Sequence, residues 1–151
     1  MPNKEPITVL VVDESHAFRR STVDWIDSRP DLHLVGTASS GTEALEVVER
    51  VRPDLVIVEA VLAGMDGFRL ARALKKLPDP PLILLVTFHA TATARDEAYA
   101  AGADGFLAKG DFSDEIEAIL EAWKTNRPGR ADGVTSPTKP SRRESRTVPD
   151  P

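Results

Sequence analysis

Five polar residues that could act together on a metal ion and a phosphoryl group stand beside short apolar runs in this 151-residue chain. They are Asp13, Glu14, Glu59, Thr87 and Lys109. Carboxylate oxygens are ligands that Mg²⁺ prefers, and the metal can orient a phosphoryl group for in-line attack by another carboxylate. A hydroxyl and an ammonium could then hydrogen-bond the phosphoryl oxygens. This set is therefore suited to metal-assisted phosphoryl transfer onto a carboxylate.

An alternation of apolar and amphipathic segments must position these residues. Nearly continuous apolar runs are typical of parallel strands covered on both faces, and the expected strands cover 8–12, 32–37, 55–58, 82–86 and 105–108. Helical spacing between and after them predicts helices, with Ser40, Asp66 and Ser113 as N-caps. Five βα units in series imply an α/β fold around an open parallel sheet.

In open α/β sheets the working site lies beyond the carboxyl ends of the strands. The first strand ends before Asp13, the third ends in Glu59, and the fourth ends in Thr87. Lys109 follows the fifth strand. We therefore expect the three carboxylates, the hydroxyl and the ammonium to converge on one small pocket.

The segment around Glu59 resembles a known family. The apolar strand before it, the loop Gly64-Met65-Asp66-Gly67 after it and the other four pocket residues together resemble the response-regulator receiver domain (CheY-like) of two-component (phosphorelay) signal transduction. The resemblance covers residues 7–124. It implies a flavodoxin-like, doubly wound (βα)5 fold whose five-stranded parallel sheet has the order 2-1-3-4-5.

The resemblance also implies roles for single residues. Asp13 and Glu14 match the metal-binding acidic pair, which with Glu59 would hold Mg²⁺, and Glu59 stands where the family has its phosphoacceptor aspartate. The switch group comprises Thr87, Phe106 and Lys109. Partner proteins would dock on the face formed by the fourth helix, fifth strand and fifth helix, for which the candidates are Tyr99, Ala100, Leu107 and Ala108.

Three residues depart from the family pattern. Glu59 is one methylene longer than aspartate, Ala63 replaces the usual loop proline, and Gly110 replaces the proline that usually follows the lysine. The extra methylene moves the carboxylate by roughly 1.5 Å, and in-line transfer tolerates little misplacement. A longer carboxylate could instead reach Lys109 and form a buried ion pair.

Glu59 is therefore open to three interpretations. The chain is a phosphorylation-independent pseudo-receiver fixed in one state, a passive interaction scaffold, or a working receiver that still takes phosphate from a histidine kinase at Glu59 or a nearby acid. Asp54 is a poor substitute acceptor because it precedes the strand, and Asp66 is expected to cap a helix.

Composition and charge indicate the domain organisation and the location of the chain. Residues 1–124 hold 13 basic and 21 acidic residues. Residues 125–151 hold six basic and three acidic residues, together with five of the 12 prolines. We expect a receiver domain at 1–124 and a disordered basic Pro/Ser/Arg-rich tail at 125–151. The chain has no cysteine, no membrane-length apolar run and no apolar leader, so a cytoplasmic location is expected.

Enzyme and DNA-binding classes lack support in the sequence. Asp13-Glu14-Ser15 after the first strand offers no glycines for a dinucleotide pyrophosphate, and no cap insertion of a hydrolase is visible. The stretch 102–110 resembles receivers that precede a DNA-binding helix-turn-helix, but no such domain follows in this chain. We therefore expect a non-enzymatic protein-binding module with weak Mg²⁺ binding, which could also form a homodimer.

Overall fold

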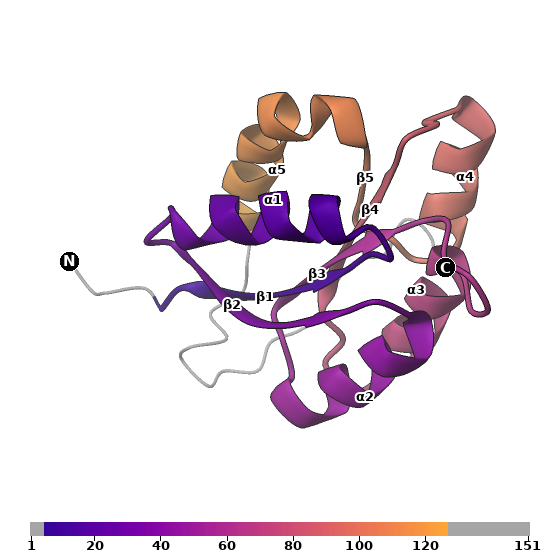
Figure 1. Cartoon of the computed structure of the whole chain (residues 1–151), viewed down its shortest axis with the longest axis horizontal. Coiled ribbons are helices and arrows are strands. Elements are labelled where there is room, and N and C mark those ends of the chain that lie inside the picture. Colours follow the sequence, from indigo (N-terminus) through magenta and orange to yellow (C-terminus); the bar gives the residue numbers. More distant parts are fainter. Residues whose placement is uncertain (1–4, 127–151) are drawn as a thin grey trace.

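The structure is a computed structural model, and it describes residues 5–126. Five strands alternate with five helices along these residues (Figure 1). The strands are β1 (Ile7–Val12), β2 (Leu32–Ala38), β3 (Leu55–Glu59), β4 (Leu82–Thr87) and β5 (Gly105–Ala108). The helices are α1 (His16–Asp27), α2 (Gly41–Val51), α3 (Gly67–Lys75), α4 (Ala92–Ala100) and α5 (Phe112–Asn126), with a short 3₁₀ turn, Lys109–Asp111, before α5.

All strand pairs are parallel, and the sheet order is β2-β1-β3-β4-β5. Two apolar layers fill the space between the sheet and the helices. α1 and α5 pack on one face through residues such as Ile26, Ile116 and Leu120, and α2, α3 and α4 cover the other face (Figure 1). The predicted flavodoxin-like fold and strand order are confirmed.

The predicted helix starts are confirmed at two of three places. The side chains of Ser40 and Asp66 accept hydrogen bonds from the backbone N–H groups three residues later, at 3.1 and 2.9 Å. The prediction that Ser113 caps the last helix is wrong, because α5 already begins at Phe112. Phe112 is buried and its ring meets those of Phe18 and Trp25 edge to face, so packing fixes this start.

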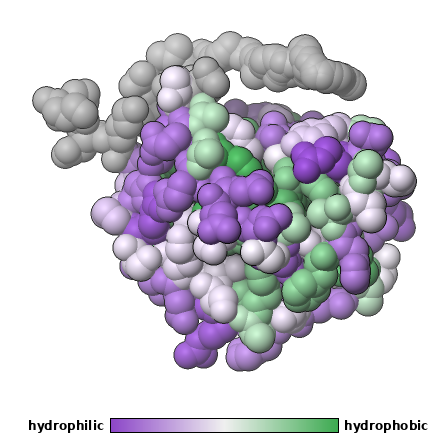
Figure 2. Space-filling model, turned by 90° about the horizontal axis from the view of Figure 1, so that it is seen from above, coloured by the Kyte–Doolittle hydropathy of each residue, from purple (hydrophilic) through white to green (hydrophobic). Residues whose placement is uncertain are grey.

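The last helix, α5, ends at Asn126, the last residue that the structure describes. The tail predicted at 125–151 lies outside the described residues from 127 onward. Within residues 5–126, no helix is both long and apolar enough to span a bilayer. Figure 2 shows one face of the molecule, on which hydrophobic residues form a band through a largely hydrophilic surface.

Candidate functional site

The five predicted residues meet in one pocket of about 420 Å³. It lies beyond the carboxyl ends of β1, β3, β4 and β5, at the topological switch point between β1 and β3. Its lining comprises Asp13, Glu14, Ser15, Glu59, Val61, Thr87, Phe88, His89 and Lys109. All five line this pocket because each ends or follows a strand of the same parallel sheet.

Lys109 joins two of the acids. Its Nζ lies 2.8 Å from Asp13 Oδ2 and 2.6 Å from Glu59 Oε1. The three side chains are 3%, 2% and 7% exposed respectively, so the charges lie out of bulk water. Burial disfavours the ammonium, but its close contacts with the carboxylates of Asp13 and Glu59 outweigh burial and raise the pKa of Lys109 above its ordinary value of 10.5. Lys109 is therefore held as a cation.

Aromatic rings enclose the same ammonium. Lys109 Nζ lies 4.4 Å from the ring centroids of both Phe18 and Phe88. Phe18 comes from α1 and is partly buried, whereas Phe88 is 69% exposed at the mouth of the pocket. A cation over aromatic faces gains an attraction of about 0.5–2 kcal/mol, so the rings help to fix the lysine toward the acids.

Both oxygens of the Glu59 carboxylate are engaged. Oε1 meets Lys109, and Oε2 accepts a hydrogen bond of 2.8 Å from the backbone N–H of Val61. The direct ion pair with Lys109 that the longer side chain suggested is therefore present. Val61 itself is 69% exposed, so the loop residue supplies its N–H to the site while its side chain faces solvent.

The loop after β1 is ordered around Asp13. Its Oδ1 accepts from the N–H of Ser15 at 2.8 Å, and its backbone N–H donates to Ala38 at 3.0 Å. Arg19 on α1 donates to the Asp13 carbonyl at 2.5 Å. Asp13 Oδ2 is buried and, although close to Lys109, makes no directional hydrogen bond among the described residues.

The third acid is bonded to a different loop. Glu14 Oε2 accepts a hydrogen bond of 2.6 Å from the backbone N–H of Ala63, in the loop after β3. Within residues 5–126, no three acidic or histidine side chains are grouped so that they could hold a metal ion. The predicted set Asp13, Glu14 and Glu59 lines one pocket, but its oxygens do not converge as Mg²⁺ coordination requires.

The three switch residues occupy different surroundings. Thr87 is buried in the pocket, and its hydroxyl oxygen accepts a long hydrogen bond of 3.4 Å from the backbone N–H of His89. Phe106 is 3% exposed and packs in the layer with α2, α3 and α4, beneath the guanidinium of Arg95 at 5.4 Å. The structure therefore brings Thr87 and Lys109 together and leaves Phe106 in the adjacent core.

The predicted docking residues differ in their exposure to solvent. Tyr99 is 45% exposed and Ala100 is exposed, while Ala108 is half-buried. Leu107 is 3% exposed and packs in the layer with α1 and α5, which corrects its assignment to the docking face. Successive strand residues point to opposite faces, so Phe106 and Leu107 each enter a core layer.

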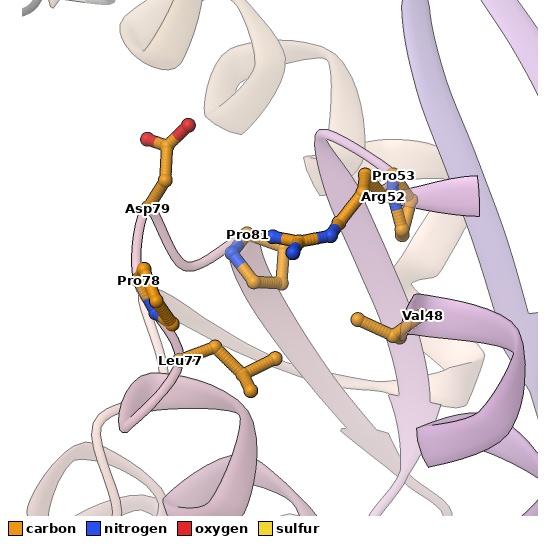
Figure 3. Close-up of a pocket in the computed structure, with 7 residues that line it drawn as sticks. All are labelled: Val48, Arg52, Pro53, Leu77, Pro78, Asp79 and Pro81. Carbon is orange, nitrogen blue, oxygen red and sulfur yellow. The ribbon is translucent and has the colours of Figure 1, made fainter. Parts of the chain in front are cut away.

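A second pocket of about 90 Å³ lies at the opposite edge of the sheet, beside the amino ends of β3 and β4. Figure 3 shows the Arg52 side chain extending toward Pro81, with the Asp79 carboxylate directed away from the other labelled residues. Prolines and aliphatic side chains make up most of this lining. The pocket is small and has no cluster of carboxylates, so the acidic pocket remains the candidate site.

Sequence reasoning missed several groups of the acidic pocket. The aromatic pair Phe18 and Phe88 has no motif of its own, although Phe88 directly follows Thr87. The N–H donors of Ser15, Val61 and Ala63 depend on loop conformation rather than residue type. Only their places in the loops after β1 and β3 could have indicated them.

The comparisons with known proteins agree with this geometry. A family model described as the response regulator receiver domain matches residues 9–121. The chain is 32% identical over 124 residues to the probable transcriptional regulatory protein NarL of Mycobacterium tuberculosis, covering 82% of this chain and 57% of that protein. It is also 32% identical over 164 residues to a protein-glutamate methylesterase/protein-glutamine glutaminase of Koribacter versatilis, covering 95% and 45%.

Solved structures give the same result. The signal receiver domain of the putative response regulator NarL from Mycobacterium tuberculosis has a TM-score of 0.74 and 31% identity, covering 80% of this chain and 98% of that one. The response regulator domain of Thermotoga maritima CheB has a TM-score of 0.71 and 28% identity, with 80% and 96% covered. The chain spans about half the length of the curated relatives named above. It belongs to the response regulator receiver domain family of two-component signalling.

Proposed function

We propose that this chain is a phosphorylation-independent pseudo-receiver, which acts in two-component signalling by binding proteins rather than by catalysis or by accepting phosphate. One observation carries the proposal: both Glu59 oxygens are engaged, by Lys109 at 2.6 Å and by the Val61 N–H at 2.8 Å. An acceptor must present a free oxygen in line with the phosphoryl group, and an error near 1 Å can cost about 100-fold in rate. Glu59, in the place of the acceptor aspartate, does not meet this requirement.

The ion pair gives Glu59 a different role. Its carboxylate puts a negative charge beside Lys109, where a phosphoryl group on an acceptor would otherwise lie. The mimicry is partial, because a carboxylate carries one charge and a phosphoryl group about −1.5 to −2. In this account Mg²⁺ binds only weakly, since the ammonium of Lys109 is already paired with both Asp13 and Glu59.

The binding surface in this proposal is the face of α4, β5 and α5. Tyr99 and Ala100 are exposed on α4, and Ala98 is the only residue of that helix that is fully buried. An exposed tyrosine among alanines offers a contact of low conformational cost to a partner. The occupant would be a target protein, a second copy of the chain or a histidine kinase.

A working phosphoacceptor is the second candidate. The observation in its favour is the open pocket of about 420 Å³ that Glu59 lines together with Asp13, Thr87 and Lys109. In that case Glu59 or a nearby acid would take the phosphoryl group after Lys109 had moved.

Substitution at position 59 tests the proposal. Glu59→Asp, alone and with Gly110→Pro, should take up phosphate from acetyl phosphate with Mg²⁺ on a phosphate-affinity gel, whereas the wild type and Glu59→Gln should not shift. Equal labelling of the wild type and Glu59→Asp would overturn the proposal. If neither aspartate variant labels, the site has lost phosphoacceptance through more than residue 59.

A further inference from the structure

A backbone N–H donor holds each of the three acids at the site. Ser15 donates to Asp13 at 2.8 Å, Val61 to Glu59 at 2.8 Å and Ala63 to Glu14 at 2.6 Å. The first two bonds are local, within two residues of the acid. The third joins residues 49 positions apart and ties the loop after β1 to the loop after β3.

This third bond determines where the Glu14 carboxylate lies. Glu14 is exposed, unlike Asp13 and Glu59, so no packing fixes its side chain. With its carboxylate on Ala63, it does not join the other two acids, and no three acidic groups within residues 5–126 are arranged as a metal site. A divalent ion such as Mg²⁺ or Mn²⁺ requires several oxygens in near-octahedral geometry.

We propose that the Ala63 N–H is a positioning group that keeps Glu14 away from Asp13 and Glu59, and thereby keeps the divalent-cation affinity of the pocket low. This inference rests on the proposed function, because a pocket closed to divalent cations lacks the metal that phosphoryl transfer onto a carboxylate uses. Lys109 then remains the cation of the site, paired with Asp13 and Glu59.

Proline at position 63 removes the backbone N–H donor. Ala63 is exposed, and its φ is not among the positive values of the described chain, so proline meets no left-handed backbone at this position. Ala63→Ser is the matched control, since it changes the side chain and keeps the N–H. Glu14→Asp is a second, independent variant, because the shorter side chain keeps its charge but places the carboxylate farther from the Ala63 N–H.

The test is a Mn²⁺ titration of each full chain, with free Mn²⁺ measured by electron paramagnetic resonance. Ala63→Pro and Glu14→Asp should bind Mn²⁺ about three- to ten-fold more tightly than the wild type, the factor by which loss of one net hydrogen bond changes an equilibrium. Ala63→Ser should match the wild type. Circular dichroism establishes that each variant is folded.

Two results would overturn the inference. One is an unchanged Mn²⁺ affinity in both Ala63→Pro and Glu14→Asp, and if the proline variant does not fold, Glu14→Asp alone decides. The other is an equal gain in Ala63→Ser, which would assign the effect to the side chain. No phosphodonor is present, so failure of this inference is distinct from phosphate uptake at Glu59, which would refute the proposed function.

Discussion

Lys109→Met would remove the cation that two buried carboxylates share. Asp13 and Glu59 are 2% and 7% exposed and lie 2.8 and 2.6 Å from Lys109 Nζ, so solvent cannot replace the lost ammonium. Removal of one partner from a buried ion pair costs about 3–5 kcal/mol. We expect the free energy of unfolding at pH 7 to fall by that amount, mainly because both acids stay buried without a counter-charge.

Urea unfolding followed by tryptophan fluorescence and circular dichroism measures this loss. Lys124→Met is the matched control: Lys124 is 26% exposed and pairs with Asp31 at 2.5 Å near the surface, so its loss should cost about 1 kcal/mol or less. Adding Glu59→Gln to Lys109→Met should recover part of the stability, because one of the two opposed charges is gone.

The pH dependence gives a second readout of Lys109. Because its pKa is raised in the folded chain, its stabilising contribution is fully present below the ordinary value of 10.5 and is lost only as the pH rises through the higher folded pKa. The deficit of Lys109→Met relative to the wild type should therefore shrink as the pH rises above 10.5, because the wild type then loses the same contribution. A deficit at pH 7 no larger than that of Lys124→Met would show that Lys109 does not stabilise the two buried carboxylates.

Two further predictions concern local stability. Arg29 donates to Asp31 at 2.8 Å, and together with Lys124 it lowers the pKa of Asp31, although burial acts in the opposite direction. Urea unfolding of Asp31→Asn should therefore show a free energy of unfolding about 1 kcal/mol below that of the wild type at pH 7. This difference should disappear as the pH falls below 3.8 and through the lowered folded pKa. Asp66→Ala removes the N-cap of α3, whose oxygen lies 2.9 Å from the Arg69 N–H, and should lower the thermal unfolding free energy by about 1 kcal/mol; Asp66→Ser should retain most of it.

The strands were predictable because their physical cause is local. Runs such as Leu82 to Val86 are apolar at every position, which only a strand buried on both faces requires. Once the strands are known, their shared parallel direction places Thr87 and Lys109 at the same edge of the sheet. The pocket residues followed from topology rather than from any single motif.

The remainder depends on tertiary packing and loop conformation. Phe112 begins α5 one residue before the expected cap because its ring packs against Phe18 and Trp25. Leu107 is buried because α5 covers its face of the sheet, a covering that residue type does not reveal. The Glu14 carboxylate accepts a hydrogen bond from the N–H of Ala63, 49 residues away in the sequence.

The mass of the intact wild-type chain after incubation with acetyl phosphate and Mg²⁺ reports whether Glu59 accepts phosphate. Because Lys109 and the Val61 N–H engage both oxygens of Glu59, we expect no added mass. A gain of one phosphoryl group that maps to Glu59 and is released by hydroxylamine would contradict it, and would make this chain a working receiver with a glutamate acceptor.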